Sequence, residues 1–87
     1  MNEVVKVFIN PTCGPCINLK EWLDEKDIPY IQRDVVNNQE AATEFKEIDG
    51  QFTPTTLITS GDEKYKVIGF NPQKIERILS LNEETDN

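Results

Sequence analysis

Two cysteines, Cys13 and Cys16, stand three positions apart where a strand-like segment gives way to a helix-like one. Residues 4–9 are mostly apolar and β-branched, which is typical of a strand covered on both faces of its sheet. After a turn at residues 10–12, apolar residues recur three and four positions apart, as on one face of a helix. We therefore expect both sulfurs at the start of a helix that directly follows a buried strand.

This position favours thiol chemistry. A thiol at a helix N-terminus faces unpaired backbone N–H groups and the positive end of the helix dipole, and both stabilise the nucleophilic thiolate. Cys13 lies at or just before the first helical position and is predicted to be exposed and to attack a disulfide. Cys16 lies one turn on, faces inward and is predicted to resolve the mixed disulfide. Gly14 adds no bulk beside the attacking sulfur, and Pro15 suits a first helical turn.

Two other interpretations of the cysteine pair stay open. A free cysteine is often a small buried apolar residue, so the chain can be a binding module in which the pair is inert. Two thiolates from each of two chains can also hold an Fe–S cluster or zinc, and in that case the chain is a homodimeric metal carrier. One chain by itself cannot build a structural zinc site, because such a site takes four ligands and the chain has two cysteines and no histidine.

Length and charge narrow the class of protein. With 87 residues, the chain is expected to form one domain over residues 1–87. The net charge of −7 argues against nucleic acid or an anionic membrane as partner. The lack of histidine excludes Ser–His–Asp and Cys–His mechanisms. No apolar run approaches the ~18 residues of a membrane span, and no secretory signal is visible, so we expect a cytoplasmic protein.

The remaining segments predict the element order β-α-β-α-β-β-α. The first two strands flank a helix, which requires a parallel, right-handed crossover, and the last two form a hairpin. We predict an α/β fold with a four-stranded mixed sheet flanked by helices, and a frayed tail over residues 82–87. Predicted strands cover residues 4–9, 30–34, 55–59 and 64–68, and the last two helices begin after Asn37-Asn38 and at Asn71-Pro72.

With these features in place, the chain resembles a glutaredoxin-like member of the thioredoxin superfamily. The resemblance extends over nearly all of residues 4–81 and implies the thioredoxin/glutaredoxin fold. It rests on three motifs that occur in the family's order, namely Cys13-Gly14-Pro15-Cys16, Thr53-Pro54 and Gly69-Phe70.

The resemblance implies roles for residues far from the cysteines. The Thr53–Pro54 bond is expected to be cis, with Pro54 facing the redox pair and Thr53 offering its backbone to a bound substrate. The surface around the cysteine pair is expected to consist of apolar side chains and exposed backbone, which suits docking against a protein. The substrate-binding residues expected from the resemblance are Thr12, Gly14, Pro15, Thr53, Pro54, Gly69 and Phe70.

Departures from the family pattern indicate the subtype. Glutathione-dependent glutaredoxins usually carry Gly-Gly and two aspartates near the last helix, whereas residues 69–74 here read Gly-Phe-Asn-Pro-Gln-Lys. Asn10 stands where the family often has a basic residue, and Thr12 stands where thioredoxins have tryptophan. The Gly-Phe-x-Pro stretch resembles NrdH-type redoxins, which are reduced by thioredoxin reductase and pass electrons to ribonucleotide reductase.

The resemblance as a whole implies a monomeric thiol–disulfide oxidoreductase that reduces disulfides in a protein substrate. No bound cofactor or metal is implied within this chain. Thioredoxin reductase is the expected source of reducing equivalents. A glutathione-dependent glutaredoxin is the alternative within the same class.

Overall fold

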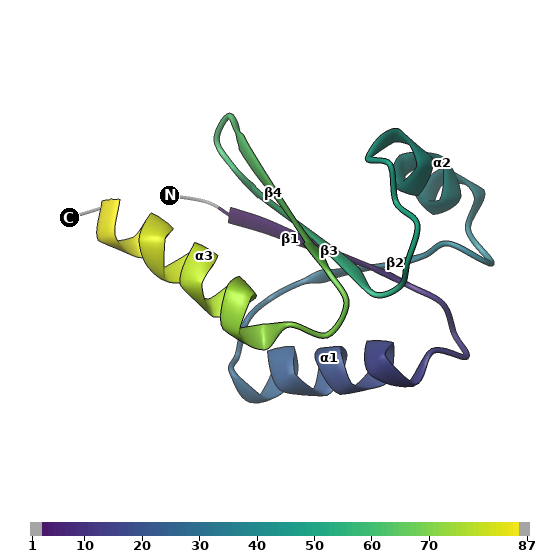
Figure 1. Ribbon diagram of the computed structural model, residues 1–87, viewed down its shortest axis with the longest axis horizontal. Coiled ribbons are helices and arrows are strands. Elements are labelled where there is room, and N and C mark those ends of the chain that lie inside the picture. Colours follow the sequence, from purple (N-terminus) through teal and green to yellow (C-terminus); the bar gives the residue numbers. More distant parts are fainter. Residues whose placement is uncertain (1–2, 86–87) are drawn as a thin grey trace.

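A computed structural model describes residues 3–85 of the chain (Figure 1). The strands form one four-stranded mixed sheet in the order β2-β1-β3-β4. Strand β1 is parallel to β2 and antiparallel to β3, and β4 is antiparallel to β3, which confirms the predicted fold class. The elements are β1 (Glu3–Ile9), α1 (Gly14–Glu25), β2 (Ile31–Asp34), α2 (Gln39–Glu47), β3 (Thr55–Ser60), β4 (Glu63–Ile68) and α3 (Pro72–Thr85).

Helices cover both faces of the sheet, because successive residues of β1 point to opposite sides. Val5, Val7 and Ile9 pack into the main apolar cluster together with side chains of α1 and α3. Phe8 points the other way, and its ring centroid lies 5.6 Å from that of Phe45 on α2. Figure 1 shows the same arrangement, with α1 and α3 on one side of the sheet and α2 on the other. Full burial of a side chain such as Phe8 contributes about 1.5–3 kcal/mol.

A cluster of charged side chains ties α2 to the two strands beneath it. Lys6 of β1 donates to Oε2 of Glu44 at 2.7 Å, and Arg33 of β2 pairs with the other carboxylate oxygen. The hydrogen bond from Lys6 is the main reason that the pKa of Glu44 lies below its ordinary value; burial opposes the shift and Arg33 adds to it. The Glu44 side chain is 30% exposed, so water screens part of the attraction.

Short-range contacts determine where elements begin. Cys13 is the N-cap of α1, with Pro15 in the first turn. Asn38 is the N-cap of α2, where its Oδ1 accepts from the backbone N–H of Ala41 at 3.0 Å. The β3–β4 hairpin turns at Gly61, whose φ of 59° favours glycine.

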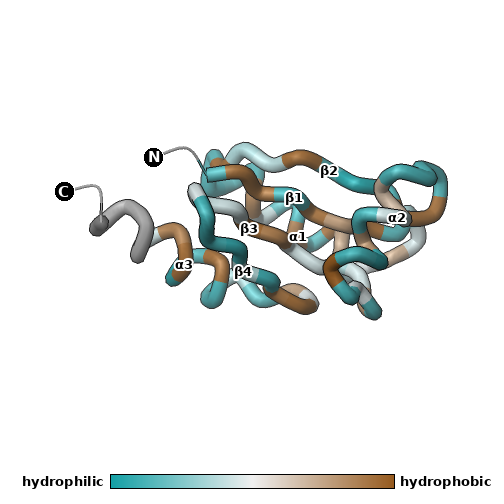
Figure 2. Tube along the Cα trace, turned by 90° about the horizontal axis from the view of Figure 1, so that it is seen from above, coloured by the Kyte–Doolittle hydropathy of each residue, from teal (hydrophilic) through white to brown (hydrophobic). Residues whose placement is uncertain are grey.

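Helix α3 is amphipathic, and its inner face carries the buried Ile75 and Ile78. Figure 2 shows apolar and polar residues interleaved along the coloured, N-terminal part of this helix. Its backbone stays helical to Thr85, so the tail predicted to fray from residue 82 is in part helical, because no glycine or proline interrupts the helix. Residues 86–87 of that tail lie outside the described residues. Between residues 3 and 85, no helix combines the length and the apolar character that crossing a membrane requires.

The strand register gathers three distant segments at one end of the sheet. Phe8, near the end of β1, pairs with Thr55 at the start of β3. Thr55 in turn pairs with Ile68, the last residue of β4. The loop after β1, the loop before β3 and the turn after β4 therefore meet. These segments are residues 10–13, 52–54 and 69–70.

Candidate active site

The first of these segments is a tight turn that delivers Cys13 to the start of α1. The Cys13 N–H donates to the backbone oxygen of Asn10 at 2.9 Å. Pro11 occupies the second position of this turn, where its restricted φ is favourable. The side chain of Asn10 also takes part, because its Oδ1 accepts from both the N–H and the hydroxyl of Thr12 at 3.0 Å.

Cys13 and Cys16 are joined by a disulfide across the first turn of α1, with their Cα atoms 5.3 Å apart. Cys13 has extended backbone angles, as an N-cap residue should, and its Sγ accepts from the Cys16 N–H at 3.2 Å. Cys13 is partly accessible, whereas Cys16 is only 1% exposed and packs into the core. The predicted difference in exposure between the two sulfurs is therefore confirmed.

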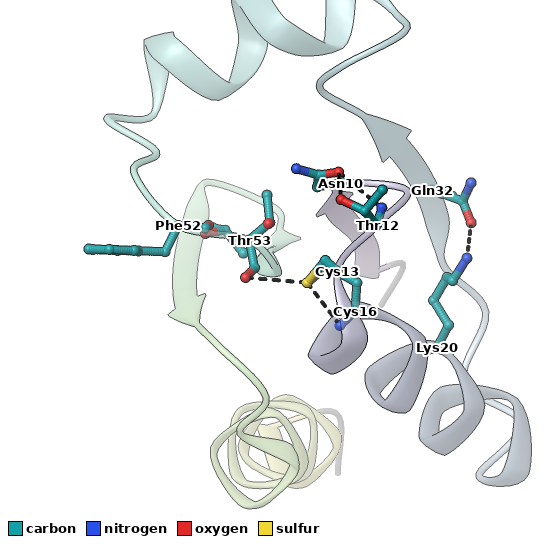
Figure 3. The surroundings of a disulfide bond; sticks show 9 residues. Asn10, Thr12, Cys13, Cys16, Lys20, Gln32, Phe52 and Thr53 are labelled. Carbon is teal, nitrogen blue, oxygen red and sulfur yellow. Dashed lines mark hydrogen bonds between the residues drawn. A yellow bond between two sulfur atoms is a disulfide. The ribbon is translucent and has the colours of Figure 1, made fainter.

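The loop before β3 faces the disulfide (Figure 3). The Thr53–Pro54 bond is cis, as predicted, and Pro54 is buried. The carbonyl oxygen of Thr53 lies 3.6 Å from the Cys13 Sγ, so it can accept a hydrogen bond from the thiol when the pair is reduced. Thr55 supports this loop by donating its hydroxyl to the Phe52 carbonyl.

The turn after β4 joins the same loop from the other side. The N–H of Gly69 donates to the carbonyl oxygen of Pro54 at 2.8 Å. Gly69 has a φ of 80°, a left-handed conformation that favours glycine. This hydrogen bond places the predicted Gly69–Phe70 segment beside Pro54, and the Phe70 side chain is 45% exposed.

Two exposed apolar residues near the site were not predicted from the sequence. Phe52 is 63% exposed and its ring points away from the disulfide (Figure 3). Ile17 is 51% exposed and lies four residues after Cys13, on the same side of α1. The signal for Phe52 was an aromatic residue in a polar loop, two positions before Pro54. We call Ile17, Phe52 and Phe70 the apolar rim.

A backbone N–H rather than a side-chain cation faces the sulfur of Cys13. The first turn of α1 carries no acidic residue. Lys20, one turn beyond Cys16, donates to the Gln32 side chain at 2.9 Å and extends away from the sulfurs (Figure 3). What faces the Cys13 sulfur is the Cys16 N–H at the positive end of the helix dipole.

A wide pocket of about 700 Å³ lies elsewhere, over the start of α2. It is lined by Arg33 and residues 37–40, 43 and 44, and none of the cysteine-site residues borders it. Among the described side chains, those of residues 3–80, no three histidine, cysteine or acidic groups gather as a metal site would require.

The arrangement matches a known family. The protein-family model for glutaredoxin matches residues 5–59, which is more than half of the chain. The chain belongs to the glutaredoxin family. With a disulfide-forming pair at the family's redox position, this glutaredoxin is a thiol oxidoreductase in the general sense. Its redox-active centre is the Cys13–Cys16 disulfide, and the fold implies a protein disulfide as substrate and a reductase as partner.

The chain is also similar to individual curated proteins. The glutaredoxin is 24% identical over 75 residues to the Gene 56 protein of Mycobacterium phage D29, covering 86% of this chain and 81% of that protein. It is 38% identical over 45 residues to the global transcriptional regulator Spx of Staphylococcus aureus, covering 52% of this chain and only 34% of Spx.

Solved structures resemble the whole sheet-and-helix arrangement. The thioredoxin-like protein BC3987 superposes with a TM-score of 0.71 at 28% identity, covering 84% of this chain and 96% of that chain. Fasciola hepatica thioredoxin superposes with a TM-score of 0.74 at 25% identity, covering 91% of this chain and 79% of that chain.

Proposed function

We propose that this glutaredoxin is a dithiol electron carrier that reduces disulfides in a protein substrate. The difference between its two sulfurs carries the proposal. The Cys13 sulfur is partly accessible and accepts a backbone N–H at 3.2 Å, whereas Cys16 is 1% exposed. An incoming disulfide can reach the first sulfur but not the second.

The proposed reaction moves two electrons in two exchange steps. The Cys13 thiolate attacks one sulfur of the substrate disulfide, and the other substrate sulfur leaves as a thiolate that takes up a proton. The Cys16 thiol loses its proton and attacks the Cys13 sulfur of the mixed disulfide. The second substrate sulfur then leaves and is protonated in turn. The substrate ends as a dithiol, and the Cys13–Cys16 disulfide remains to be reduced by a partner.

The surroundings of Cys13 suit docking against a protein. The Thr53 carbonyl is 3.6 Å from the sulfur, so a substrate segment lying beside this loop comes within reach of Cys13. The apolar rim offers three large side chains, each at least 45% exposed, around a largely uncharged centre. Burial of such side chains stabilises a complex by about 25 cal/mol per Å² of apolar surface removed from water.

We propose thioredoxin reductase as the reductant and ribonucleotide reductase as a target. Binding of glutathione needs charged partners for its amine and carboxylates, since these groups lose hydration on docking. The polar side chains where glutathione-dependent members of the family have charged groups, Asn10 and Asn71, are neutral, and the Oδ1 atom of each already accepts a hydrogen bond. Asn10 accepts from Thr12, Asn71 accepts from the Lys74 N–H at 3.4 Å, and the first turn of α3 has no acidic residue. A reducing cytoplasm is the compartment in which such a carrier is kept as a dithiol.

A paired turnover assay tests the proposal. NADPH oxidation is followed with thioredoxin reductase in one series, and with glutathione and its reductase in the other, with a protein disulfide as final acceptor. We expect much faster turnover with thioredoxin reductase, and none with the Cys13→Ser variant in either series. Equal or faster turnover with glutathione would assign the chain to glutathione-dependent glutaredoxins. A lack of turnover in both series would support an inert pair, and a brown protein after anaerobic purification would support a cluster-binding dimer.

A further inference from the structure

Asn10 accepts three hydrogen bonds from the segment that carries Cys13. Its backbone oxygen accepts from the Cys13 N–H at 2.9 Å. Its Oδ1 accepts from both the N–H and the hydroxyl of Thr12 at 3.0 Å. Asn10 thus holds both residues that lie between Pro11 and α1, namely Thr12 and Cys13. The two side-chain bonds require asparagine or a similar short acceptor at this position.

The position of the Cys13 sulfur depends on this turn. Cys13 is the N-cap, so the backbone on its N-terminal side is not held by the helix. In the oxidised structure, where the disulfide also holds it, the sulfur lies 3.2 Å from the Cys16 nitrogen and 3.6 Å from the Thr53 oxygen. Once the disulfide is reduced, the turn and the Cys16 N–H are the contacts that remain to hold the sulfur in place. If the turn opens in the reduced protein, the Cys13 side chain can rotate away from both partners while α1 itself stays intact.

We infer that Asn10 is a positioning residue that holds the Cys13 sulfur against the N–H of Cys16 and so keeps the nucleophile activated. This inference rests on the proposed role of Cys13 as the attacking thiol. A thiolate that accepts a backbone N–H is stabilised relative to the thiol, so losing the N–H contact makes Cys13 harder to ionise. Asn10 acts through this geometry without touching the substrate.

A change in nearby charges would not explain an altered ionisation of Cys13 when Asn10 is replaced by a neutral residue. Of the side chains labelled around the disulfide in Figure 3, only Lys20 carries a charge, and its Nζ donates to Gln32. The first turn of α1 has no acidic residue. Removing the neutral amide of Asn10 leaves these charges where they are. A changed ionisation of Cys13 would therefore reflect a changed geometry of the turn at residues 10–13.

The test compares three variants in the reduced protein, using the pH dependence of iodoacetamide alkylation of Cys13 from about pH 4 to pH 9. In Asn10→Ala, we expect alkylation of the Cys13 thiol in the lower half of this pH range to slow roughly three- to ten-fold, the loss expected for one net hydrogen bond. Asn38→Ala is the matched control, because it removes another asparagine cap, the bond to the Ala41 N–H at the start of α2. It should lower the melting temperature without moving the Cys13 profile.

Asn10→Asp separates geometry from charge, since its carboxylate keeps both acceptor bonds. Its added charge raises the Cys13 pKa at low salt, and about 1 M salt, with a Debye length of ~3 Å, should return the profile close to wild type. The inference is overturned by an unchanged profile in Asn10→Ala, by an equal shift in Asn38→Ala, or by Asn10→Asp remaining as slow as Asn10→Ala at high salt. Failure of the proposed function looks different: the wild-type protein would alkylate first at Cys16.

Discussion

Gly69 permits a test of whether the turn beside Pro54 needs a left-handed residue. Gly14 and Gly69 both have open space where a Cβ would be added, with no atom within 4 Å. They differ in backbone conformation, because Gly69 has a φ of 80° and Gly14 opens a right-handed helix. A Gly→Ala substitution at the two positions therefore isolates the cost of the backbone conformation from any steric clash.

The expected magnitude follows from two opposing effects. Alanine in the left-handed region costs about 1–2 kcal/mol relative to glycine. Replacing glycine also lowers the entropy of the unfolded chain, which stabilises the fold by about 0.4–1 kcal/mol where the conformation is compatible. Gly69→Ala should therefore lose about 1 kcal/mol, or about 4–8 °C in melting temperature for a domain of this size. Gly14→Ala should gain a few tenths of a kcal/mol or more, since only the entropy effect applies.

Urea unfolding of the oxidised proteins measures the difference, with equal m-values required for the comparison. The two variants should differ by about 1–2 kcal/mol, because the entropy effect is common to both. Gly69→Asn should recover part of the loss, since asparagine enters the left-handed region more readily than alanine. If Gly69→Ala proved as stable as Gly14→Ala, the left-handed requirement at this turn would be refuted. A loss in Gly69→Asn larger than in Gly69→Ala would point instead to crowding at the site.

Three further predictions concern the site and the α2 face. Cys16→Ser should trap mixed disulfides with protein substrates on non-reducing gels whereas Cys13→Ser should not, because only the accessible sulfur attacks; trapping by Cys13→Ser alone would reverse the roles. Phe70→Ala should weaken coupling to thioredoxin reductase several-fold and leave alkylation of Cys13 unchanged, since Phe70 is 45% exposed beside the site and not bonded to the sulfur; unchanged coupling would mean that Phe70 does not contact the reductase. Glu44, whose pKa is lowered chiefly by the hydrogen bond from Lys6, should stabilise the fold above its unfolded pKa and lose that contribution as pH falls through its folded pKa. Chemical unfolding of Glu44→Gln should therefore show a deficit of about 0.5–1.5 kcal/mol near neutral pH that disappears in acid, and a deficit independent of pH would contradict this cause.

The features that could be predicted from the sequence depend on contacts within about four residues. Cys13 caps α1 because its sulfur and the Cys16 N–H are one helical turn apart, and Pro15 fits the first turn for the same local reason. The hairpin at Gly61 follows from a glycine between two strand-like segments. The cis Thr53–Pro54 bond is predicted from the family resemblance together with the turn just before a strand.

The contacts around the Cys13 sulfur could not be predicted from neighbouring residues in the same way. The sequence predicts Asn10 as a turn residue at a position where the family often has a basic residue, but its role as an acceptor depends on how its side chain turns onto Thr12. The exposure of Phe52 could not be predicted, because it depends on the path of the loop before β3. The Lys6–Glu44 contact joins residues 38 positions apart and follows from the packing of α2 on β1.

The sequence by itself determined the element order and the placement of two thiols at a strand-to-helix junction, because periodicity, caps and turns act over short stretches of chain. Only the tertiary structure decided what faces those thiols. The Thr53 oxygen approaches the Cys13 sulfur across 40 residues because the antiparallel register of β1 and β3 brings their loops together. The same packing buries Cys16 under the sheet's apolar face and leaves Cys13 partly accessible at the edge of the core, since α1 can present only one side to the core.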